Sequence, residues 1–285
     1  MKKTLYVSDL DGTLLRRDQT ISPFTAETIR ILVDKGMLFS YATARSLVTA
    51  NKVTKGLPVN IPVIAYNGAF IMESQTGKRL LSHVFSEEES ANILDVLLTH
   101  EIMPIVFCLA DGKEQFRYVA EKMSRGASKF LETRKGDVRE HPVSCAEELY
   151  EGEIFHITCI DEAEALAPLY TYFQKKFPCV FERDLYGGEQ WLELHPHGAT
   201  KAEAVLHLKE YLGCEKLVCF GDGKNDIPMF HAADEAYAMA NADEELKRIA
   251  TAIIGHHDED GVAKWLLKNA VKKDENIFEK IEKRY

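Results

Sequence analysis

Residues 4–15 read TLYVSDLDGTLL, a short apolar run that stops abruptly at a charged turn. Residues 4–8 are rich in strand formers, and the turn after them carries Asp9, Asp11 and Gly12. A brief apolar run bounded by a turn is typical of a strand that is buried on both faces of a parallel sheet. The stretch therefore predicts a buried strand with two carboxylates at its carboxyl end.

Helix-like and strand-like segments alternate after this strand. Ser22 and Pro23 suit the cap and first position of a helix, and Gly36 suits its end. Further elements are expected as strands over 37–42 and 61–66 with a helix over 46–55 between them, and later as a helix over 201–212, a strand over 217–220 and a helix over 225–233. Such alternation indicates an α/β fold whose parallel sheet has right-handed crossovers.

The middle of the chain has a different pattern. After Asn67-Gly68, residues 70–72 and 79–85 flank a turn and are expected to be the arms of a hairpin. A helix over 86–101 and then mixed strands and helices follow, up to about Glu189. This segment predicts an inserted α+β domain, which makes the first domain discontinuous.

Composition excludes several classes of protein. The 285 residues include 35 Lys+Arg against 45 Asp+Glu, and the net charge of -10 argues against a general nucleic-acid or anionic-membrane surface. No stretch approaches the ~20 apolar residues of a membrane-spanning helix. The six cysteines are scattered without metal-site spacing, which favours reduced thiols. We expect a cytoplasmic protein with no nucleic-acid or membrane partner; the sequence does not indicate its oligomeric state.

Four polar clusters follow predicted strands or begin predicted helices of the discontinuous domain. Ligands of open parallel sheets bind beyond the carboxyl ends of the strands, so the clusters could meet there. Any one cluster could instead be ordinary turn chemistry, because Asp, Gly, Thr and Asn are common in turns. The clusters are Asp9/Asp11/Thr13, Thr43, Lys201 and Asp222/Asn225/Asp226.

The two carboxylates of the first cluster suit a division of labour. Asp9 would be the nucleophile, and an aspartyl-phosphate would split one hard displacement into two easier ones. Asp11 would protonate the leaving oxygen and then deprotonate the attacking water. The alternative, two solvated turn carboxylates, fits this apolar context less well.

Phosphoryl transfer also needs positive groups around the equatorial oxygens. Mg²⁺ and Lys201 would supply them. Magnesium prefers a few carboxylates together with waters and substrate oxygen, so Asp9, the backbone carbonyl of Asp11 and Asp222 make a reasonable ligand set, with Asp226 steadying it from outside. Donors to phosphate oxygens would be Thr43 with the following backbone N–H, and Asn225.

The ordered set of motifs resembles the haloacid dehalogenase-like phosphatases, and within them the Cof-type group with a large cap domain. The resemblance spans nearly the whole chain. It rests on DLDGTLL at 9–15, ATAR at 42–45, NGA at 67–69, GATK at 198–201, GDGKND at 221–226 and EDGVAKWL at 259–266.

This resemblance implies a Rossmann-like core over 1–81 and 191–285 and a cap over 82–190. It assigns Asp9 as nucleophile and Asp11 as acid/base. Magnesium ligands would be Asp9, Asp11 and Asp222; phosphate contacts would be Leu10, Thr43, Ala44, Lys201 and Asn225; Thr13 and Asp226 would support them. Ala44 stands where the group usually has glycine, so a positive φ angle there would strain the phosphate loop.

The sequence does not assign a role in the reaction to two histidine pairs or to Arg45. The histidine pairs His195/His197 and His256-His257 lie on predicted loops, where imidazoles are more often solvated, and an oxygen-rich site already explains the chemistry. Arg45 could add positive potential beside the phosphate or pair with a carboxylate.

Hydrolysis of a small phosphomonoester, such as a sugar phosphate, a nucleotide or a phosphorylated cofactor, is the function expected first. Phosphoryl transfer to a second hydroxyl, as in a phosphomutase, is the alternative enzyme class, because Asp11 serves either acceptor. A catalytically silent sensor of a phosphorylated ligand is a third possibility. Released phosphate separates the first from the second, and the effect of an Asp9→Asn change on cellular function separates the third.

Overall fold

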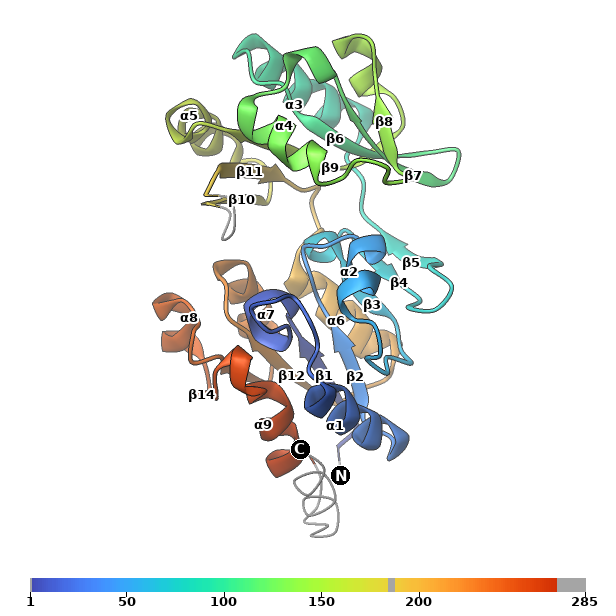
Figure 1. The fold of residues 1–285 in the computed structure, drawn as a ribbon, viewed down its shortest axis with the longest axis vertical. Coiled ribbons are helices and arrows are strands. Elements are labelled where there is room, and N and C mark those ends of the chain that lie inside the picture. Colours follow the sequence, from blue (N-terminus) through green and yellow to red (C-terminus); the bar gives the residue numbers. More distant parts are fainter. Residues whose placement is uncertain (1, 184–187, 271–285) are drawn as a thin grey trace. The chain divides into compact units, whose positions relative to one another are not determined.

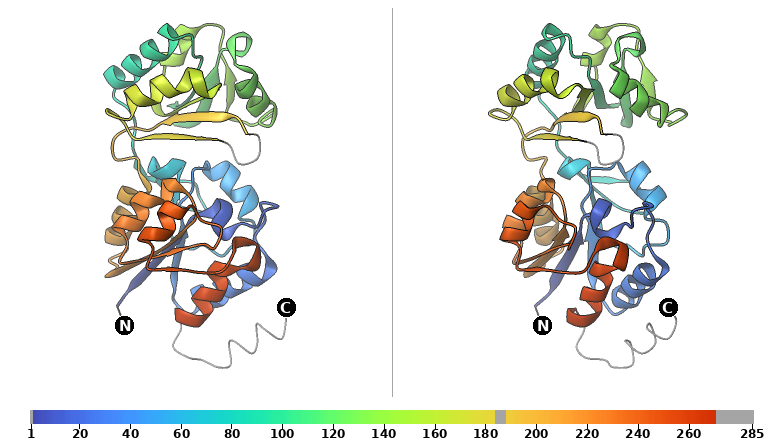
Figure 2. Two further views of the ribbon diagram at one scale, coloured as in Figure 1. Left: turned by 90° about the vertical axis from the view of Figure 1, so that its left-hand side faces the viewer. Right: turned by 60° about the vertical axis from the view of Figure 1, so that its left-hand side comes forward.

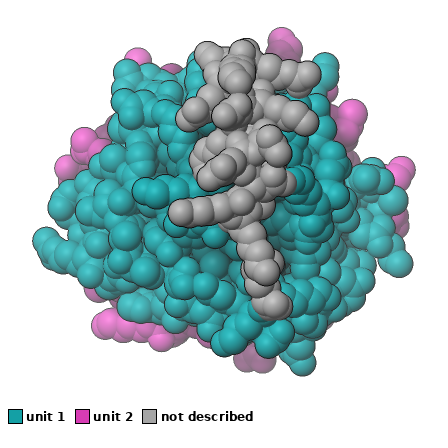
Figure 3. Space-filling view, turned by 90° about the horizontal axis from the view of Figure 1, so that it is seen from below, with its two compact units in different colours: residues 1–82, 200–285 teal, residues 83–199 magenta. Residues whose placement is uncertain are grey.

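The computed structural model describes residues 2–183 and 188–270, which fall into two compact units. Unit 1 comprises residues 1–82 and 200–285, and unit 2 comprises residues 83–199 (Figures 1 and 3). The expected return to the first domain at residue 191 lies inside strand β11 (Gln190–Leu194), which is hydrogen-bonded to two strands of unit 2. Strand pairing therefore keeps residues 191–199 in unit 2, and the chain re-enters unit 1 at Thr200.

A five-stranded parallel sheet forms the centre of unit 1. Its strand order is β14 (Ala252–Ile253), β13 (Glu235–Ala238), β12 (Lys216–Gly221), β1 (Thr4–Ser8) and β2 (Leu38–Tyr41). From β1 the chain goes on to β2, whereas from β12 it goes on to β13 on the opposite side. The strand order thus reverses between β1 and β12, the kind of switch point at which open α/β sheets bind ligands.

Helices cover both faces of this sheet (Figure 2). The helix α1 (Pro23–Asp34) begins as its sequence predicts, because the Ser22 side chain accepts a hydrogen bond from Thr25 N and Pro23 takes the first turn. It packs against α9 (Gly261–Asn269), and α6 (Lys201–Tyr211) packs against α7 (Ile227–Ala232). The shorter helices of this unit are α2 (Leu47–Val53) and α8 (Glu244–Ile249).

The third strand meets the expectation only in part: the bridge from Ile64 to Ala42 at the edge of the main sheet is parallel, but the regular pairing of the strand is with another partner. We expected residues 61–66 to extend the parallel sheet, but β3 (Val63–Ala65) pairs antiparallel with β4 (Phe70–Met72), which pairs with β5 (Arg79–Ser82). In the described part of the chain, an isolated bridge between Ala42 and Ile64 joins β3 to the edge of the main sheet. The cause is local: Tyr66, Asn67 and Gly68 have φ angles of 50°, 53° and 109°, which fold the chain back. The expected hairpin arms are confirmed.

Unit 2 is an α+β unit, as expected from its mixed pattern. Its six-stranded sheet has the order β10 (Cys179–Arg183), β11, β9 (Glu153–Asp161), β6 (Ile105–Ala110), β7 (Lys113–Tyr118) and β8 (Glu140–Pro142), and only the β7–β8 pair is parallel. Apolar residues of α3 (Glu87–Thr99) and α5 (Ala163–Phe173) form one core with residues of this sheet. The remaining α-helix is α4 (Arg125–Glu132).

A cluster of buried polar side chains lies on β9 and at the end of β11 in unit 2. The rings of His156 and His195 meet with their Nδ1 atoms 3.3 Å apart, and Thr158 Oγ1 lies 2.7 Å from His156 Nε2. Glu193 approaches both rings, at 3.5 Å and 3.9 Å from their Nε2 atoms.

None of the described helices in either unit is both long and apolar enough to cross a bilayer.

Candidate active site

Asp9 stands at the carboxyl end of β1, next to the switch point. Its backbone N–H donates to Phe220 O of β12 (2.9 Å), which ties the two central strands together at this point. The turn that follows is a short irregular helix, η1 (Leu10–Leu14), in which Gly12 has a φ angle of 74°. A Cβ atom at Gly12 would lie 2.1 Å from Asp222 Oδ2, so only glycine lets the DLDGTLL turn and the GDGKND loop approach each other this closely.

Lys201 connects Asp9 to the GDGKND motif at residues 221–226. Its ammonium group donates to Asp9 Oδ1 (2.6 Å) and to Asp226 Oδ1 (2.7 Å), and the side chain is fully buried. Burial and a position in the first turn of α6 both oppose a positive charge. The carboxylates of Asp226 and Asp9 outweigh this opposition and raise the pKa of Lys201. The lysine is therefore a fixed cation whose place is set by two carboxylates.

Asp226 organises the loop after β12. Its Oδ2 accepts the backbone N–H groups of Asp222 (3.0 Å) and Gly223 (3.1 Å), and its other oxygen accepts from Lys201. Thr13 Oγ1 donates to Asp222 Oδ1 (3.1 Å). Asp226 thus has donors on both oxygens, whereas Asp222 presents its carboxylate toward the η1 turn.

The cluster carries more negative than positive charge. One oxygen from each of Asp9, Asp222 and Asp226 lies within 4.8 Å of the others, and Lys201 supplies one ammonium. Burial, followed by the charge of Asp226, raises the pKa of Asp222 to about 7, and burial with the neighbouring carboxylates raises that of Asp9 well above its usual range. These oxygen donors and their excess charge fit a divalent cation of the magnesium type.

Asp11 is turned toward Arg45 in the structure. Arg45 donates from Nε to Asp11 Oδ2 (2.7 Å) and from Nη2 to Asp11 Oδ1 (2.6 Å), and Nη2 also donates to Gln19 Oε1 (2.9 Å). A two-pronged pair of this kind fixes the carboxylate in angle as well as in position. Of the two roles left open for Arg45, the structure therefore shows pairing with a carboxylate, and that carboxylate is the expected acid/base.

The other expected phosphate contacts lie on three loops of unit 1. Thr43 is buried, and its Oγ1 accepts the backbone N–H of Arg45 (3.1 Å). Asn225 Nδ2 donates to Asn67 Oδ1 (3.2 Å). Leu10 is a fully buried residue of η1. Ala44 is not among the residues with a positive φ angle, so the alanine carries none of the strain that a left-handed position would impose.

Two asparagines beside the cluster were given no role from the sequence. Asn67 has a φ angle of 53°, and the next residue, Gly68, lies so close to Thr200 that a Cβ atom would be 2.2 Å from its carbonyl oxygen. Asn241 Nδ2 donates to Gly12 O (2.8 Å) and lies 3.4 Å from Asp222 Oδ2. Asn241 lies three residues after the end of β13, so a search for polar side chains just beyond the strand ends, which singled out Asp9, could have found it.

A parallel α/β unit with a carboxylate and lysine cluster at its switch point, interrupted by an α+β unit, defines a class of phosphoryl-transfer hydrolases. Residues 6–266 match the model of the haloacid dehalogenase-like hydrolases, and the chain belongs to this family. The expected enzyme class and the Rossmann-like fold are thereby confirmed.

Individual relatives agree with this assignment. Two Bacillus subtilis proteins named 5-amino-6-(5-phospho-D-ribitylamino)uracil phosphatase are similar: YwtE is 27% identical over 278 residues (90% of this chain, 94% of the relative), and YitU is 27% identical over 281 residues (93% and 97%). The crystal structure of TM0651 from Thermotoga maritima has the same fold, with a TM-score of 0.76 and 24% identity over 95% of this chain and 99% of that one.

Proposed function

We propose that this chain is a Mg²⁺-dependent phosphatase that hydrolyses small phosphomonoesters through an aspartyl-phosphate on Asp9. The observation that carries the proposal is the buried contact of 2.6 Å between Asp9 Oδ1 and Lys201, at the end of β1. If Asp9 only attracted cations, it would not need to be buried against the ammonium group of Lys201; a nucleophile has to be held in one position. Lys201 engages one oxygen of Asp9 and leaves Oδ2 as the attacking atom.

In the first step, Asp9 Oδ2 forms a bond to phosphorus while the bond from phosphorus to the leaving oxygen breaks. Asp11 gives its proton to that oxygen. Lys201 holds Asp9 in position and offsets the charge of the transferring group, and the remaining donors to the phosphate oxygens are Thr43, the backbone N–H groups of Leu10 and Ala44, and Asn225. In the second step, Asp11 takes a proton from water as the water oxygen attacks phosphorus and Asp9 is released.

Arg45 is a positioning residue in this scheme. Its two hydrogen bonds fix the position and the angle of the Asp11 carboxylate, the group that gives a proton in the first step and takes one in the second. Because both prongs are short, Asp11 is presented in one orientation.

The proposed metal ligands are Asp9, Asp222 and the backbone carbonyl of Asp11. Bound Mg²⁺ would supply charge stabilisation for the phosphate oxygens. Asp226 steadies the site from outside, because both of its oxygens already accept hydrogen bonds from Lys201 and from backbone N–H groups. Thr13 orients Asp222.

The substrate is proposed to be a small phosphorylated metabolite, with phosphorylated ribitylaminouracils as a lead because two relatives carry that name. We also propose the Cof-type group for the chain, because unit 2 is an inserted α+β unit of the expected kind. The cytoplasm is the proposed compartment, supported by six cysteines that are all free thiols.

A phosphate-release screen over sugar phosphates, nucleotides and phosphorylated cofactors tests the proposal. We expect release with some of these compounds only when Mg²⁺ is present, and none from Asp9→Asn. Isomerised sugar phosphate without free phosphate would indicate a mutase instead. Release that persists in Asp9→Asn, or after the metal is chelated, would contradict the proposed mechanism.

A further inference from the structure

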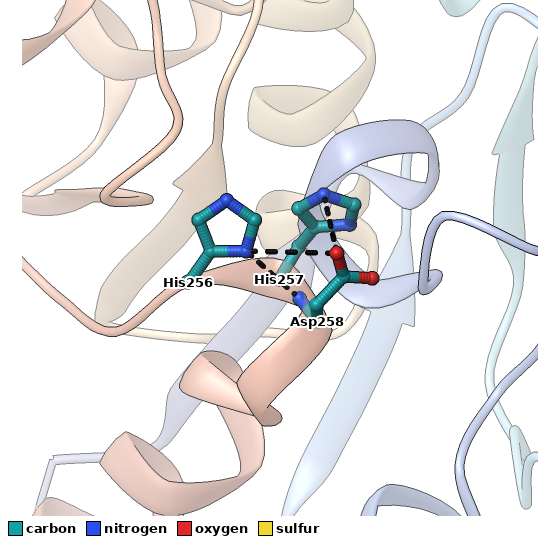
Figure 4. A group of neighbouring side chains, drawn as sticks. All are labelled: His256, His257 and Asp258. Carbon is teal, nitrogen blue, oxygen red and sulfur yellow. Dashed lines mark hydrogen bonds and ion pairs between the residues drawn. The ribbon is translucent and has the colours of Figure 1, made fainter.

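The turn before α9 brings together three electron-rich side-chain atoms (Figure 4). His256, His257 and Asp258 are consecutive, and one ligand atom from each lies within 4.8 Å of the others. Asp258 Oδ2 is 4.0 Å from His256 Nδ1 and 3.9 Å from His257 Nε2. The three side chains are between 12% and 34% exposed, so solvent and ions can reach them while the protein holds them in place.

Hydrogen bonds to the backbone determine which nitrogen of each ring carries a lone pair. His257 Nδ1 lies 2.8 Å from Leu15 O, which can only accept, so Nδ1 carries the proton and Nε2 turns a lone pair toward Asp258. His256 Nδ1 accepts the backbone N–H of Asp258 in a long hydrogen bond (3.2 Å), which an ion at this nitrogen would have to displace. One free imidazole lone pair, one that is held by a backbone N–H, and a carboxylate oxygen therefore lie close together.

We propose that His256, His257 and Asp258 form a site for a late first-row divalent ion of the Zn²⁺, Ni²⁺ or Cu²⁺ class. Imidazole nitrogen suits these ions, whereas Mg²⁺ prefers oxygen, so this site and the carboxylate cluster select different metals. The bond from His257 Nδ1 to a backbone carbonyl is the outer-shell contact that orients metal-binding histidines.

Closing the site around an ion requires the ligand atoms to approach one another and the bond from Asp258 N–H to His256 Nδ1 to be released. Tetrahedral Zn²⁺ with bonds of ~2.1 Å places its ligand atoms about 3.4 Å apart, so the two distances from Asp258 Oδ2 to the imidazole nitrogens would each contract by about 0.5 Å. Arg17 Nε lies 3.7 Å from Asp258 Oδ2, but the arginine side chain is 83% exposed and such a pair is weak. Water would complete the coordination from the exposed side.

The site joins two segments of unit 1 that are distant in the sequence. Leu15 O accepts from His257, and the backbone N–H of Arg17 donates to Asp258 Oδ1 (2.8 Å), so the turn is bound to the chain just after η1. The backbone N–H of His257 also donates to Asn241 Oδ1 (3.2 Å). A bound ion would fix this junction, and we expect it to stabilise unit 1 against unfolding.

Copper and zinc titrations of the full-length chain, without a histidine tag and with Mg²⁺ present, test the proposal. We expect the electron paramagnetic resonance spectrum of one bound Cu²⁺ to show two nitrogen ligands, because the carboxylate cluster offers only oxygen. Zn²⁺ at about 100 times its dissociation constant should raise the melting temperature by about 5 °C. A copper spectrum without nitrogen ligands would overturn the assignment.

Asparagine variants provide the matched control. His256→Asn and His257→Asn keep a polar group that can accept from or donate to the backbone, so the metal-free melting temperature should stay close to that of the parent. Each should weaken Zn²⁺ binding at least about tenfold and remove one nitrogen from the copper spectrum. His207→Asn, an exposed histidine on α6, should change neither. Unchanged binding in the first two variants, or an equal loss in the third, would refute the site.

Discussion

Each unit buries a basic side chain, and the two are held in opposite charge states: Lys201 in unit 1 and His195 in unit 2. Unit 1 encloses Lys201 with the carboxylates of Asp9 and Asp226, so a full ion pair lies in its interior and negative charge is in excess. In unit 2, burial, followed by the charge of His156, lowers the pKa of His195 to about 3, so that ring stays neutral. A buried lysine in unit 1 thus keeps its charge beside two carboxylates, whereas a buried imidazole in unit 2 stays neutral beside a second imidazole.

Removing the cation from unit 1 should have the largest effect. Lys201→Met leaves two carboxylates buried without their ammonium, and breaking such a pair costs about 3–5 kcal/mol of unfolding free energy. Phosphatase turnover should fall by about 10³-fold, because the transferring group loses its fixed charge. Chemical denaturation and phosphate release measure the two effects.

Lys209→Met is the matched control on the same helix. Lys209 pairs with Asp234 at the surface (2.8 Å), so its loss should change stability by less than about 1 kcal/mol and leave activity intact. Equal losses in the two variants would remove the contrast between the buried and the exposed lysine.

Removal of the metal should make the stability of unit 1 fall as the pH rises from acid to neutral. Asp222 has a folded pKa of about 7, whereas the ordinary pKa of an aspartate is 3.8. The folded state therefore binds more protons between these values, and stability falls as the pH rises from about 4 to 7. We expect a loss of about 2–4 kcal/mol across this range in the metal-free protein. Mg²⁺ should largely abolish the loss and should bind more tightly as the carboxylates ionise. Flat metal-free stability over this range would contradict the account.

Unit 2 should respond to pH with the opposite sign. The folded pKa of His195 is about 3, whereas the ordinary pKa of a histidine is 6.5. The unfolded state therefore binds more protons, and stability falls as the pH drops below 6.5. At pH 5 the loss should be about 2 kcal/mol. His195→Asn should remove this component of the acid dependence, as measured by urea unfolding at several pH values, whereas His100→Asn, an exposed histidine on the same unit, should retain it.

The positioning role of Arg45 predicts the smallest effect. Arg45→Lys keeps the charge but loses the two-pronged geometry, so we expect kcat to fall about 10- to 100-fold with little change in KM. Gln19→Ala removes only the outer partner of Arg45 and should cost less than about threefold. A KM effect larger than the kcat effect would indicate that Arg45 binds substrate instead.

The search for polar side chains at strand ends predicted most of the parallel unit, because three of the four expected polar clusters follow a buried apolar run. Pairing partners were harder to predict: β3 turns back on β4 because of the φ angles at Tyr66 and Asn67, which the strand pattern does not encode. The boundary at residue 191 failed for a similar reason, since β11 reads as an ordinary strand and its neighbours are distant in the sequence. Asn241 was missed because a single asparagine after a strand is usually a turn residue.

The Arg45–Asp11 pair could not be read from spacing either. The two residues belong to different motifs, and either could have faced solvent. Only the placement of the β1 and β2 ends side by side brings them together.

Trapping the intermediate tests the central claim most directly. Asp11→Asn should still react with p-nitrophenyl phosphate, whose leaving group needs little protonation, but should hydrolyse the intermediate slowly. After an acid quench, borohydride reduction and peptide mass spectrometry, we predict homoserine at position 9, dependent on substrate and absent when Asp9→Asn is added. Phosphate release by the parent without any such modification of Asp9 in Asp11→Asn, or a modification at another carboxylate, would contradict Asp9 as the nucleophile.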